Sequence, residues 1–209
     1  MMRSSGRLYA FDVSDRRLAK LKPRLARSGL SNVNPVLIDS EHDAKIKRLA
    51  GKIDRVLVDA PCSGLGTLRR NPDLKWRQSP ESVAELTPKQ LSILTSASRL
   101  VKVGGRLVYA TCSMLEAENE GVVTQFLSTH PQFKLVPAKD VLAEQRIDLD
   151  TGDYLQLWPH KHGTDGFFAA VLERLPNPAK ETPTEEAAAE SVVSAHVDYG
   201  MATIRGQSR

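Results

Sequence analysis

The stretch Asp54–Gly66, DRVLVDAPCSGLG, decides the fold of this chain. A short apolar run, Val56–Val58, ends on the carboxylate of Asp59 and passes into a turn rich in Pro, Ser and Gly that holds Cys62. An apolar run of this length between turn residues is typical of a buried strand in a parallel sheet. Ligands of open α/β sheets bind beyond the carboxyl ends of the strands. We therefore expect Asp59 and Cys62 to lie at the mouth of a ligand crevice.

A second stretch, residues 106–113 (RLVYATCS), has the same design. Its apolar run leads into Cys112, and Cys62 and Cys112 are the two cysteines of the chain. A small residue packed at a sheet edge is the ordinary explanation for such a cysteine. Facing positions at the ligand end of neighbouring strands favour a functional pair instead. Cys112 precedes a predicted helix over 115–129, whose N-terminus would favour a thiolate, whereas Cys62 is presented rigidly after Pro61.

Strands and helices alternate along the first two thirds of the chain. Strands are predicted at 7–11, 34–38, 54–58 and 106–110, with helices at 14–28, 43–50, 88–101 and 115–129 and a polar loop at 64–85. This alternation predicts a right-handed, mostly parallel α/β sheet. The remainder, at 133–136, 155–158 and 167–173, is β-rich. We expect one domain over 1–175 and a disordered tail over 176–209, because Pro, Lys, Glu and Ala dominate there.

Three predicted strands end on a carboxylate, at Asp12, Asp39 and Asp59. A single aspartate after a strand is usually a helix cap or turn residue. In a Rossmann-like sheet, however, an acid at this place accepts hydrogen bonds from ribose hydroxyls. Three equivalent acids therefore favour a nucleoside cofactor. The turn at 64–66 (GLG) is a weak pyrophosphate cradle, because Arg69 stands where a third glycine is expected.

Composition narrows the class of protein. Hydrophobic residues make up 41% of the chain and the net charge is +4, which suits either a polyanionic partner or an ordinary basic surface. The N-terminus has no apolar core of a signal peptide, and no run approaches the ~18 apolar residues of a membrane span. We expect a cytoplasmic protein with reduced thiols and no membrane partner. No Cys/His spacing typical of a metal site is present, so no metal is expected.

Several ungapped motifs then appear in order. They are 59–64 (DAPCSG), 71–76 (NPDLKW), 109–113 (YATCS) followed by Glu116, Glu118 and Asn119, and 162–169 (HGTDGFFA). Over about 6–173 the chain resembles the RsmB/Sun family of RNA (cytosine-5) methyltransferases. Within that family it is most similar to the bacterial enzymes that act on small-subunit (16S) ribosomal RNA. The resemblance implies a Rossmann-like S-adenosylmethionine-dependent methyltransferase sheet.

The resemblance also implies roles for the polar residues at the strand ends. Cys112 would be the nucleophile that adds to carbon 6 of cytosine. Cys62 would assist loss of the carbon 5 proton and release of the enzyme–RNA adduct. Asp59 would lie beside the target base and the methyl end of S-adenosylmethionine. Asp12 would bind the cofactor's ribose and Asp39 its adenine.

Further implied contacts surround these groups. Pro61, next to the Asp59 site, is expected to contact the cofactor. The basic residues of the following loop, Arg69, Arg70, Lys75 and Arg77, are candidate contacts to RNA phosphates, most simply of ribosomal RNA. Solvated loop charges are an equal alternative for them. The target base must be unpaired or flipped out to reach the thiols.

The chain departs from the family at its beginning. The family's first motif is a strand followed by a Gly-rich turn with a lysine, and nothing before Asp12 supplies it. We therefore expect a sheet that lacks its first strand, weak cofactor binding and an upstream complementing segment as partner. The alternative function is an inactive or RNA-binding fragment of such an enzyme. A thiol redox protein is less favoured, because redox cysteines are normally spaced Cys-x-x-Cys.

Overall fold

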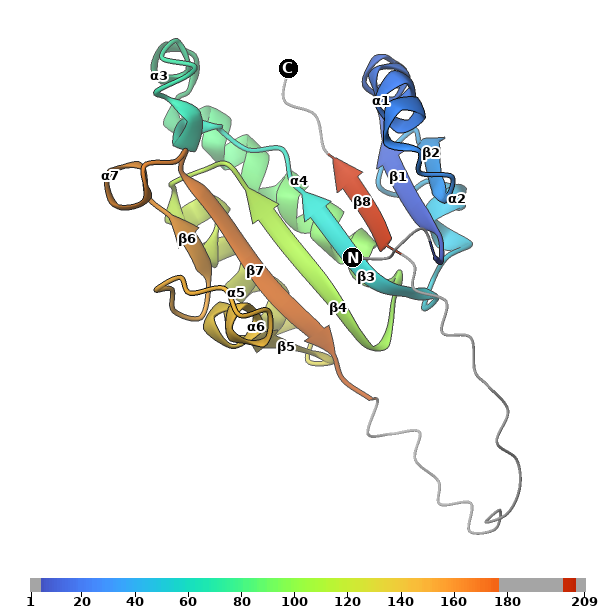
Figure 1. The fold of residues 1–209 in the computed structure, drawn as a ribbon. Helices are drawn as coiled ribbons and strands as arrows, with labels where there is room; N and C mark the ends of the chain where they lie inside the picture. Colours follow the sequence, from blue (N-terminus) through green and yellow to red (C-terminus); the bar gives the residue numbers. More distant parts are fainter. Residues whose placement is uncertain (1–4, 177–200, 206–209) are drawn as a thin grey trace, which may run out of the picture.

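The computed structural model describes residues 5–176 and 201–205, which form one twisted sheet with helices packed on it (Figure 1). The strand order is β2-β1-β8-β3-β4-β7-β5, and β6 pairs with β7. Strands β1, β2, β3, β4 and β8 run parallel, whereas β7 is antiparallel to β4, β5 and β6. The bounds are β1 Leu8–Asp12, β2 Val33–Leu37, β3 Ile53–Asp59, β4 Val101–Thr111, β5 Phe133–Val136, β6 Leu155–Leu157, β7 Phe167–Arg174 and β8 Met201–Arg205. The expected mostly parallel α/β sheet is confirmed.

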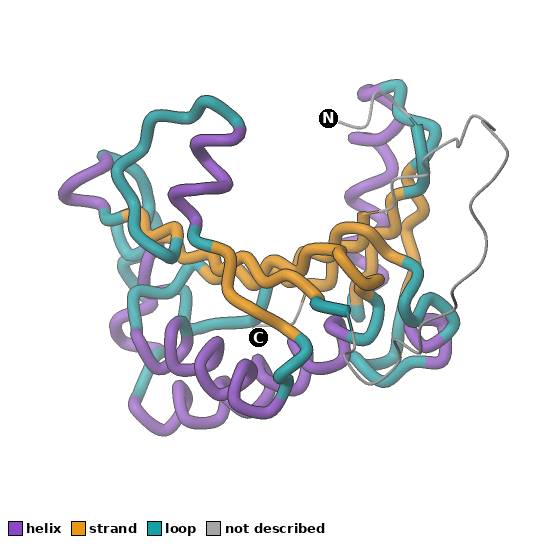
Figure 2. Tube along the Cα trace, turned by 90° about the horizontal axis from the view of Figure 1, so that it is seen from below, coloured by secondary structure: helices purple, strands orange, loops and turns teal. Residues whose placement is uncertain are grey.

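Most of the helices gather on one face of the sheet (Figure 2). The bounds are α1 Asp15–Ser28, α2 Ala44–Lys47, α3 Leu74–Arg77, α4 Pro80–Ser98, α5 Glu120–Thr129, α6 Ala138–Glu144 and α7 Pro159–His162, with 3₁₀ turns η1 Leu65–Thr67 and η2 Glu116–Glu118. Helix α4 packs across β3 and β4. Buried Leu94, Leu107 and Phe126 belong to the core between these layers. No helix in the described part of the chain is long and apolar enough to cross a membrane.

Helix α4 begins at Pro80, eight residues before the expected start at 88, so the predicted polar loop over 64–85 was wrong in its second half. Ser79 caps the helix: its hydroxyl accepts the N–H of Ser82 at 3.2 Å, while the Ser82 hydroxyl accepts the N–H of Ser79 at 3.0 Å. This reciprocal capping box satisfies two backbone donors, and Pro80 suits the first helical position, which needs no N–H. The helix continues through Pro88.

Strand β8 occupies the centre of the sheet, between β1 and β3 and parallel to both. The segment 201–205 was expected to belong to a disordered tail, and the sheet was expected to lack a strand at its centre. In the structure this late segment fills that position. The facing edges of β1 and β3 would otherwise leave backbone donors and acceptors unpaired, and Thr203 and Ile204 are β-branched residues that suit a strand. The rest of the predicted tail, 177–200 and 206–209, lies outside the described residues.

Candidate active site

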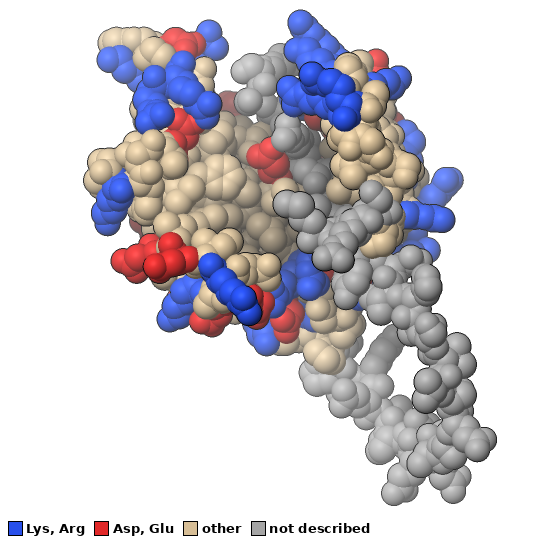
Figure 3. Space-filling view, viewed as in Figure 1, with Lys and Arg blue, Asp and Glu red and all other residues tan. Residues whose placement is uncertain are grey.

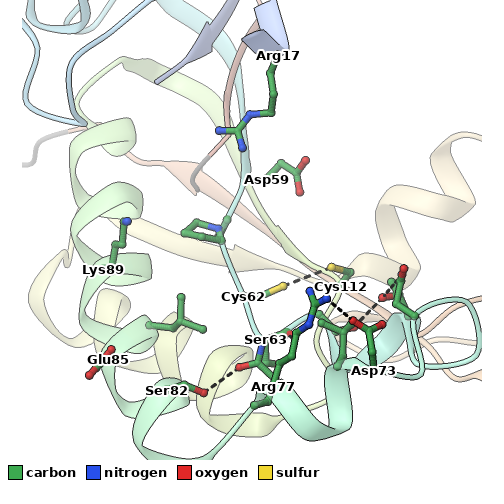
Figure 4. Close-up of a pocket in the computed structure, with 18 residues that line it drawn as sticks. Arg17, Asp59, Cys62, Ser63, Asp73, Arg77, Ser82, Glu85, Lys89 and Cys112 are labelled. Carbon is green, nitrogen blue, oxygen red and sulfur yellow. Dashed lines mark hydrogen bonds and ion pairs between the residues drawn. The ribbon is translucent and has the colours of Figure 1, made fainter. Parts of the chain in front are cut away.

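Two cysteines meet at the carboxyl edge of the sheet. Strands β3 and β4 are parallel neighbours, with Asp59 opposite Ala110, so both chains leave the sheet side by side. The Sγ atoms of Cys62 and Cys112 lie 3.4 Å apart, within hydrogen-bond distance (Figure 4). Both cysteines are free thiols. The expected proximity of the two strand-end cysteines is therefore present in the structure.

The pKa values of the two thiols are shifted in opposite directions. The hydrogen bond from Cys62 lowers the pKa of Cys112, and this effect outweighs the opposing effect of burial. The pKa of Cys62 is raised, first by the same hydrogen bond and then by burial, since only 7% of the residue is exposed. Cys62 is therefore the sulfur that holds its proton more tightly. Cys112, which is only half-buried, is the sulfur that ionises first.

A cavity of about 850 Å³ opens beside this pair. Asp59, Pro61, Cys62 and Cys112 line it together, as do Arg17 from α1 and Arg77 from α3. In Figure 4 the Arg17 and Asp59 side chains lie above the two sulfur atoms, and Arg77 lies below them. An acid, two thiols and two guanidinium groups thus face one space at the place where α/β sheets bind ligands.

Asp12 ends β1, which β8 separates from β3, and it is covered by Arg17. Its residue is 3% exposed, and the Arg17 guanidinium donates to it from Nε at 2.8 and 3.0 Å and from Nη2 at 2.7 Å. This hydrogen-bonded pair raises the pKa of Arg17. The N–H of Ser14 also donates to the Asp12 carboxylate at 2.8 Å. Asp12 is therefore well placed at the carboxyl edge, with a side chain in front of it that must turn aside before a ribose can bind.

The third predicted acid, Asp39, is not brought to the same space. It follows β2, is exposed, and its N–H donates to the Asp43 carboxylate at 3.0 Å. Asp39 lines neither the 850 Å³ cavity nor the adjoining one of about 370 Å³ that Asp12 and Arg17 share. The cavity, Asp59 and Asp12 fit a nucleoside cofactor. The structure leaves Asp39 at the outer rim.

The basic loop after Cys62 is exposed and partly ion-paired. Arg69 and Arg70 both reach the Asp165 carboxylate, and Arg77 pairs with Asp73 at 2.8 Å. On the face of the molecule shown in Figure 3, Lys and Arg side chains gather over α1 and over α3.

An exposed tryptophan lies within this loop. Trp76 is 81% exposed, and the Nζ of Lys75 lies 4.6 Å from its ring centroid. A large aromatic face in water beside cations is typical of a stacking surface.

Comparison with known proteins agrees with these features. The family model described as 16S rRNA methyltransferase RsmB/F matches residues 1–173. The chain belongs to this family. S-adenosylmethionine is the cofactor of such methyltransferases, and the resemblance and fold class expected from the sequence are both confirmed.

Individual relatives of the family show the same likeness. The chain is 40% identical over 174 residues to a probable ribosomal RNA small subunit methyltransferase B of Synechocystis sp., covering 83% of this chain and 39% of that protein. The corresponding Bacillus subtilis protein is 36% identical over 185 residues, with the same coverage of 83% and 39%. The chain thus spans about two fifths of the curated relatives it matches.

Solved structures agree as well. The crystal structure of PH0851 superposes with a TM-score of 0.74 at 41% identity, covering 83% of this chain and 38% of that one. NSun6 from Pyrococcus horikoshii with SFG superposes with a TM-score of 0.69 at 30% identity, covering 83% and 43%.

Sequence reasoning missed two residues of this RsmB/F-family site. Arg17 is not among the site residues predicted from the sequence, although its place five residues after the strand-ending Asp12 is a usable signal. Glu118 was noticed only as part of a motif. It is 0% exposed and accepts hydrogen bonds from the serines that follow both cysteines. A glutamate within a 3₁₀ turn gives no periodic sign of burial.

Proposed function

We propose that this chain is the catalytic part of an S-adenosylmethionine-dependent RNA cytosine-5 methyltransferase acting on 16S ribosomal RNA. The observation that carries the proposal is the thiol pair: the Cys62 and Cys112 sulfurs lie 3.4 Å apart, with pKa values displaced in opposite directions, beside Asp59. Cys112 is therefore the sulfur suited to attack, and Cys62 is the one suited to hold a proton. Family membership supplies the substrate class.

Cys112 is the proposed nucleophile. Its thiolate adds to carbon 6 of a cytosine, forming a C–S bond and moving electron density to carbon 5. The Asp59 carboxyl group hydrogen-bonds the ring nitrogen as charge develops there. When bound, S-adenosylmethionine supplies the methyl group that carbon 5 accepts.

Cys62 is the proposed group for release. In the free protein its pKa is raised mainly by the hydrogen bond to Cys112. Once the Cys112 sulfur is bonded to carbon, it carries no negative charge and accepts a hydrogen bond only weakly. The pKa of Cys62 therefore falls. Cys62 can then lose its own proton to water and, as a thiolate, take the carbon 5 proton. The electron pair of the broken C–H bond restores the ring double bond as the C–S bond breaks, which returns Cys112 as a thiolate.

The cofactor is proposed to lie along the strand ends. Asp12 would accept the ribose hydroxyls after Arg17 turns aside, and Asp59 and Pro61 would border the reacting end. Asp39, on the rim, would reach only the outer edge of the adenine. Arg17 also lines the cavity beside Asp59.

The RNA is proposed to cross the basic loop. Lys75 is the cation of this loop beside Trp76, whereas Arg69, Arg70 and Arg77 share their charge with Asp165 and Asp73. The contribution of these three arginines to phosphate binding is therefore smaller than that of three unpaired cations.

A second candidate is a fragment that retains the fold without turnover. The position of β8 favours it, because the centre of the sheet is filled by residues 201–205 rather than by a strand that leads into a Gly-rich turn. Such a turn presents backbone N–H groups to a ligand, as cofactor sites in related sheets do.

The deciding experiment traps the covalent step. The chain, its Cys62→Ala variant and its Cys112→Ala variant are incubated with radiolabelled S-adenosylmethionine and a 16S rRNA transcript. A labelled RNA–protein adduct that accumulates in Cys62→Ala and is absent from Cys112→Ala supports the proposed roles. Absence of both adduct and methyl transfer in every form favours the fragment. In that case the same assay with an upstream family segment supplied in trans shows whether turnover is restored.

A further inference from the structure

A buried glutamate joins the two cysteine loops. Glu118 is 0% exposed, and all its carboxylate donors are uncharged. Oε1 accepts the N–H of Ser63 at 2.8 Å and the Nε2 of Gln90 at 3.0 Å. Oε2 accepts the hydroxyls of Ser63 and Ser113, each at 2.5 Å. Four donors on one buried carboxylate make up most of its acceptor capacity.

These donors belong to the loops that carry the thiols. Ser63 directly follows Cys62, and Ser113 directly follows Cys112. The two serine hydroxyls also lie 3.2 Å from each other. A single side chain therefore holds the residue after each cysteine, although the cysteines leave different strands.

The carboxylate itself is held from behind. The Tyr109 hydroxyl donates to the Glu118 carbonyl oxygen at 2.6 Å. The neighbouring Asn119 accepts the Thr111 hydroxyl at 2.6 Å and donates to the Ser113 carbonyl at 3.1 Å. Turn η2 is thereby fixed to the end of β4 before its glutamate reaches across to the other loop.

We propose that Glu118 is a positioning residue that holds the Cys62 and Cys112 sulfurs within hydrogen-bond distance of each other. The consequence for catalysis rests on the proposed function, but the geometric claim stands apart from it. Because a buried ionised carboxylate is costly unless it is hydrogen-bonded, losing a donor on either loop destabilises the arrangement. The four bonds thus favour one relative position of the loops.

The charge of Glu118 works against thiolate formation. It is among the causes that raise the proton affinity of Cys62, and it opposes the lowered pKa of Cys112. A purely electrostatic role and a positioning role therefore predict opposite results. Removing only the charge would lower the pKa of Cys112. Separating the loops removes the hydrogen bond from Cys62, and the pKa of Cys112 rises.

Site-specific thiol labelling tests this. The chain is treated with iodoacetamide across a pH series, and peptide mass spectrometry gives the rate at Cys62 and Cys112 separately. The Glu118→Gln variant keeps the side-chain size but places an NH₂ group among donors. The expected result is a midpoint for Cys112 that rises and a Cys112-to-Cys62 rate ratio that falls about tenfold, the change that one pKa unit produces.

Glu116→Gln is the matched control, because it removes the same charge from the same turn at an exposed position. The control is expected to keep the wild-type ratio and midpoint. Ser113→Ala removes one of the four bonds and is expected to change both in the same direction as Glu118→Gln, by less.

Three results would overturn the proposal. The first is a Glu118→Gln variant that keeps the wild-type rate ratio and Cys112 midpoint. The second is a Glu118→Gln variant in which the Cys112 midpoint falls. The third is a Glu116→Gln variant whose rate ratio falls as much as that of Glu118→Gln. If Glu118→Gln loses the wild-type circular dichroism spectrum, Ser113→Ala decides by the same criteria. Labelling needs neither cofactor nor RNA, so a chain that fails the adduct assay can still pass this test.

Discussion

The sulfur of Cys62 lies 3.4 Å from that of Cys112, although the two residues are 50 positions apart in the chain. Parallel pairing of β3 with β4 explains this, because it brings both carboxyl ends to one edge of the sheet. Hydrogen bonds from the serines beside both cysteines then hold the two loops together through Glu118. At this separation the two sulfurs are within hydrogen-bond distance and their pKa values are shifted in opposite directions, so the site does not hold two equivalent thiols.

The Cys62→Ala variant is expected to raise the pH midpoint of Cys112 alkylation. In the wild type, the hydrogen bond from Cys62 is the largest cause of the lowered pKa of Cys112. Alanine removes that donor while burial remains, so the thiolate of Cys112 loses its stabilisation and forms at higher pH. A rise of about one pH unit is the usual size for a lost hydrogen bond to the charged form.

The reciprocal variant provides the control for that experiment. Cys112→Ala removes the acceptor that raises the pKa of Cys62, so Cys62 is expected to react at lower pH than in the wild type. Midpoints that move in the same direction in both variants would show that the sulfurs do not share a proton.

Replacing Gly66 by alanine is expected to destabilise the protein by about 1–3 kcal/mol, the usual cost of overpacking. A Cβ on Gly66 would lie 2.2 Å from the Gly166 carbonyl oxygen and 2.7 Å from that of Cys112. Both obstacles are backbone. The Gly66 N–H also donates to the Cys112 carbonyl at 2.9 Å, so the added carbon must push the loop off β4. Urea unfolding measures the loss.

Gly152→Ala is the control, because a Cβ there meets nothing within 4 Å. Equal unfolding midpoints for the two variants would contradict the close backbone crossing at Gly66.

The same glycine shows what sequence reasoning could and could not supply. Residues 64–66 were weighed as a phosphate cradle, because a Gly-x-Gly turn has that chemistry in other sheets. In the structure Gly66 instead lets one backbone pass another, since the Gly166 N–H donates to its carbonyl at 2.7 Å. That contact joins segments a hundred residues apart, which no local pattern reports. The cysteines, in contrast, were predictable because strand ends and turn residues are local signals.

Other differences have similar causes. The start of α4 could have been predicted, because Ser79, Pro80 and Ser82 form a local capping pattern. The polar residues around it made the segment look like a loop. The ion pair of Arg17 with Asp12 depends on how α1 leaves β1, which the charge pattern of the helix does not show. The placement of residues 201–205 in the sheet depends on an opening between β1 and β3, which is a property of the whole fold.

Trp76 is expected to report RNA binding directly. Its ring is 81% exposed beside Lys75, so an unpaired base can stack on it and quench its fluorescence. The chain has two tryptophans, and a Trp158→Phe background isolates the signal of Trp76. In that background an unstructured oligoribonucleotide is expected to quench the emission. Trp76→Ala is expected to weaken binding roughly tenfold, because stacking contributes ~1–3 kcal/mol per base.

Trp76→Phe is the matched variant and is expected to keep most of the affinity through its aromatic ring. In a Trp76→Phe chain the remaining tryptophan is Trp158. If RNA still quenches the emission of that chain, Trp76 is not the stacking surface. Equal affinities of the alanine and phenylalanine variants would also contradict the stacking surface.

Proline at position 203 is expected to loosen one side of the sheet and leave the other intact. Thr203 pairs in register with Ala10 of β1 and Leu57 of β3, so a residue without an N–H removes a ladder hydrogen bond at the centre. Among the described strands, β1 and β2 join the rest of the sheet through β8. The opening free energy of β1 should therefore fall by at least about 1 kcal/mol, the contribution of one such bond. Hydrogen exchange is expected to quicken over 8–28 and to stay unchanged over β4 and β7.

Thr203→Val keeps the N–H and the branched side chain, so it is expected to exchange like the wild type. Unchanged exchange over β1 in Thr203→Pro would show that the strand contributes nothing to this half of the sheet in solution.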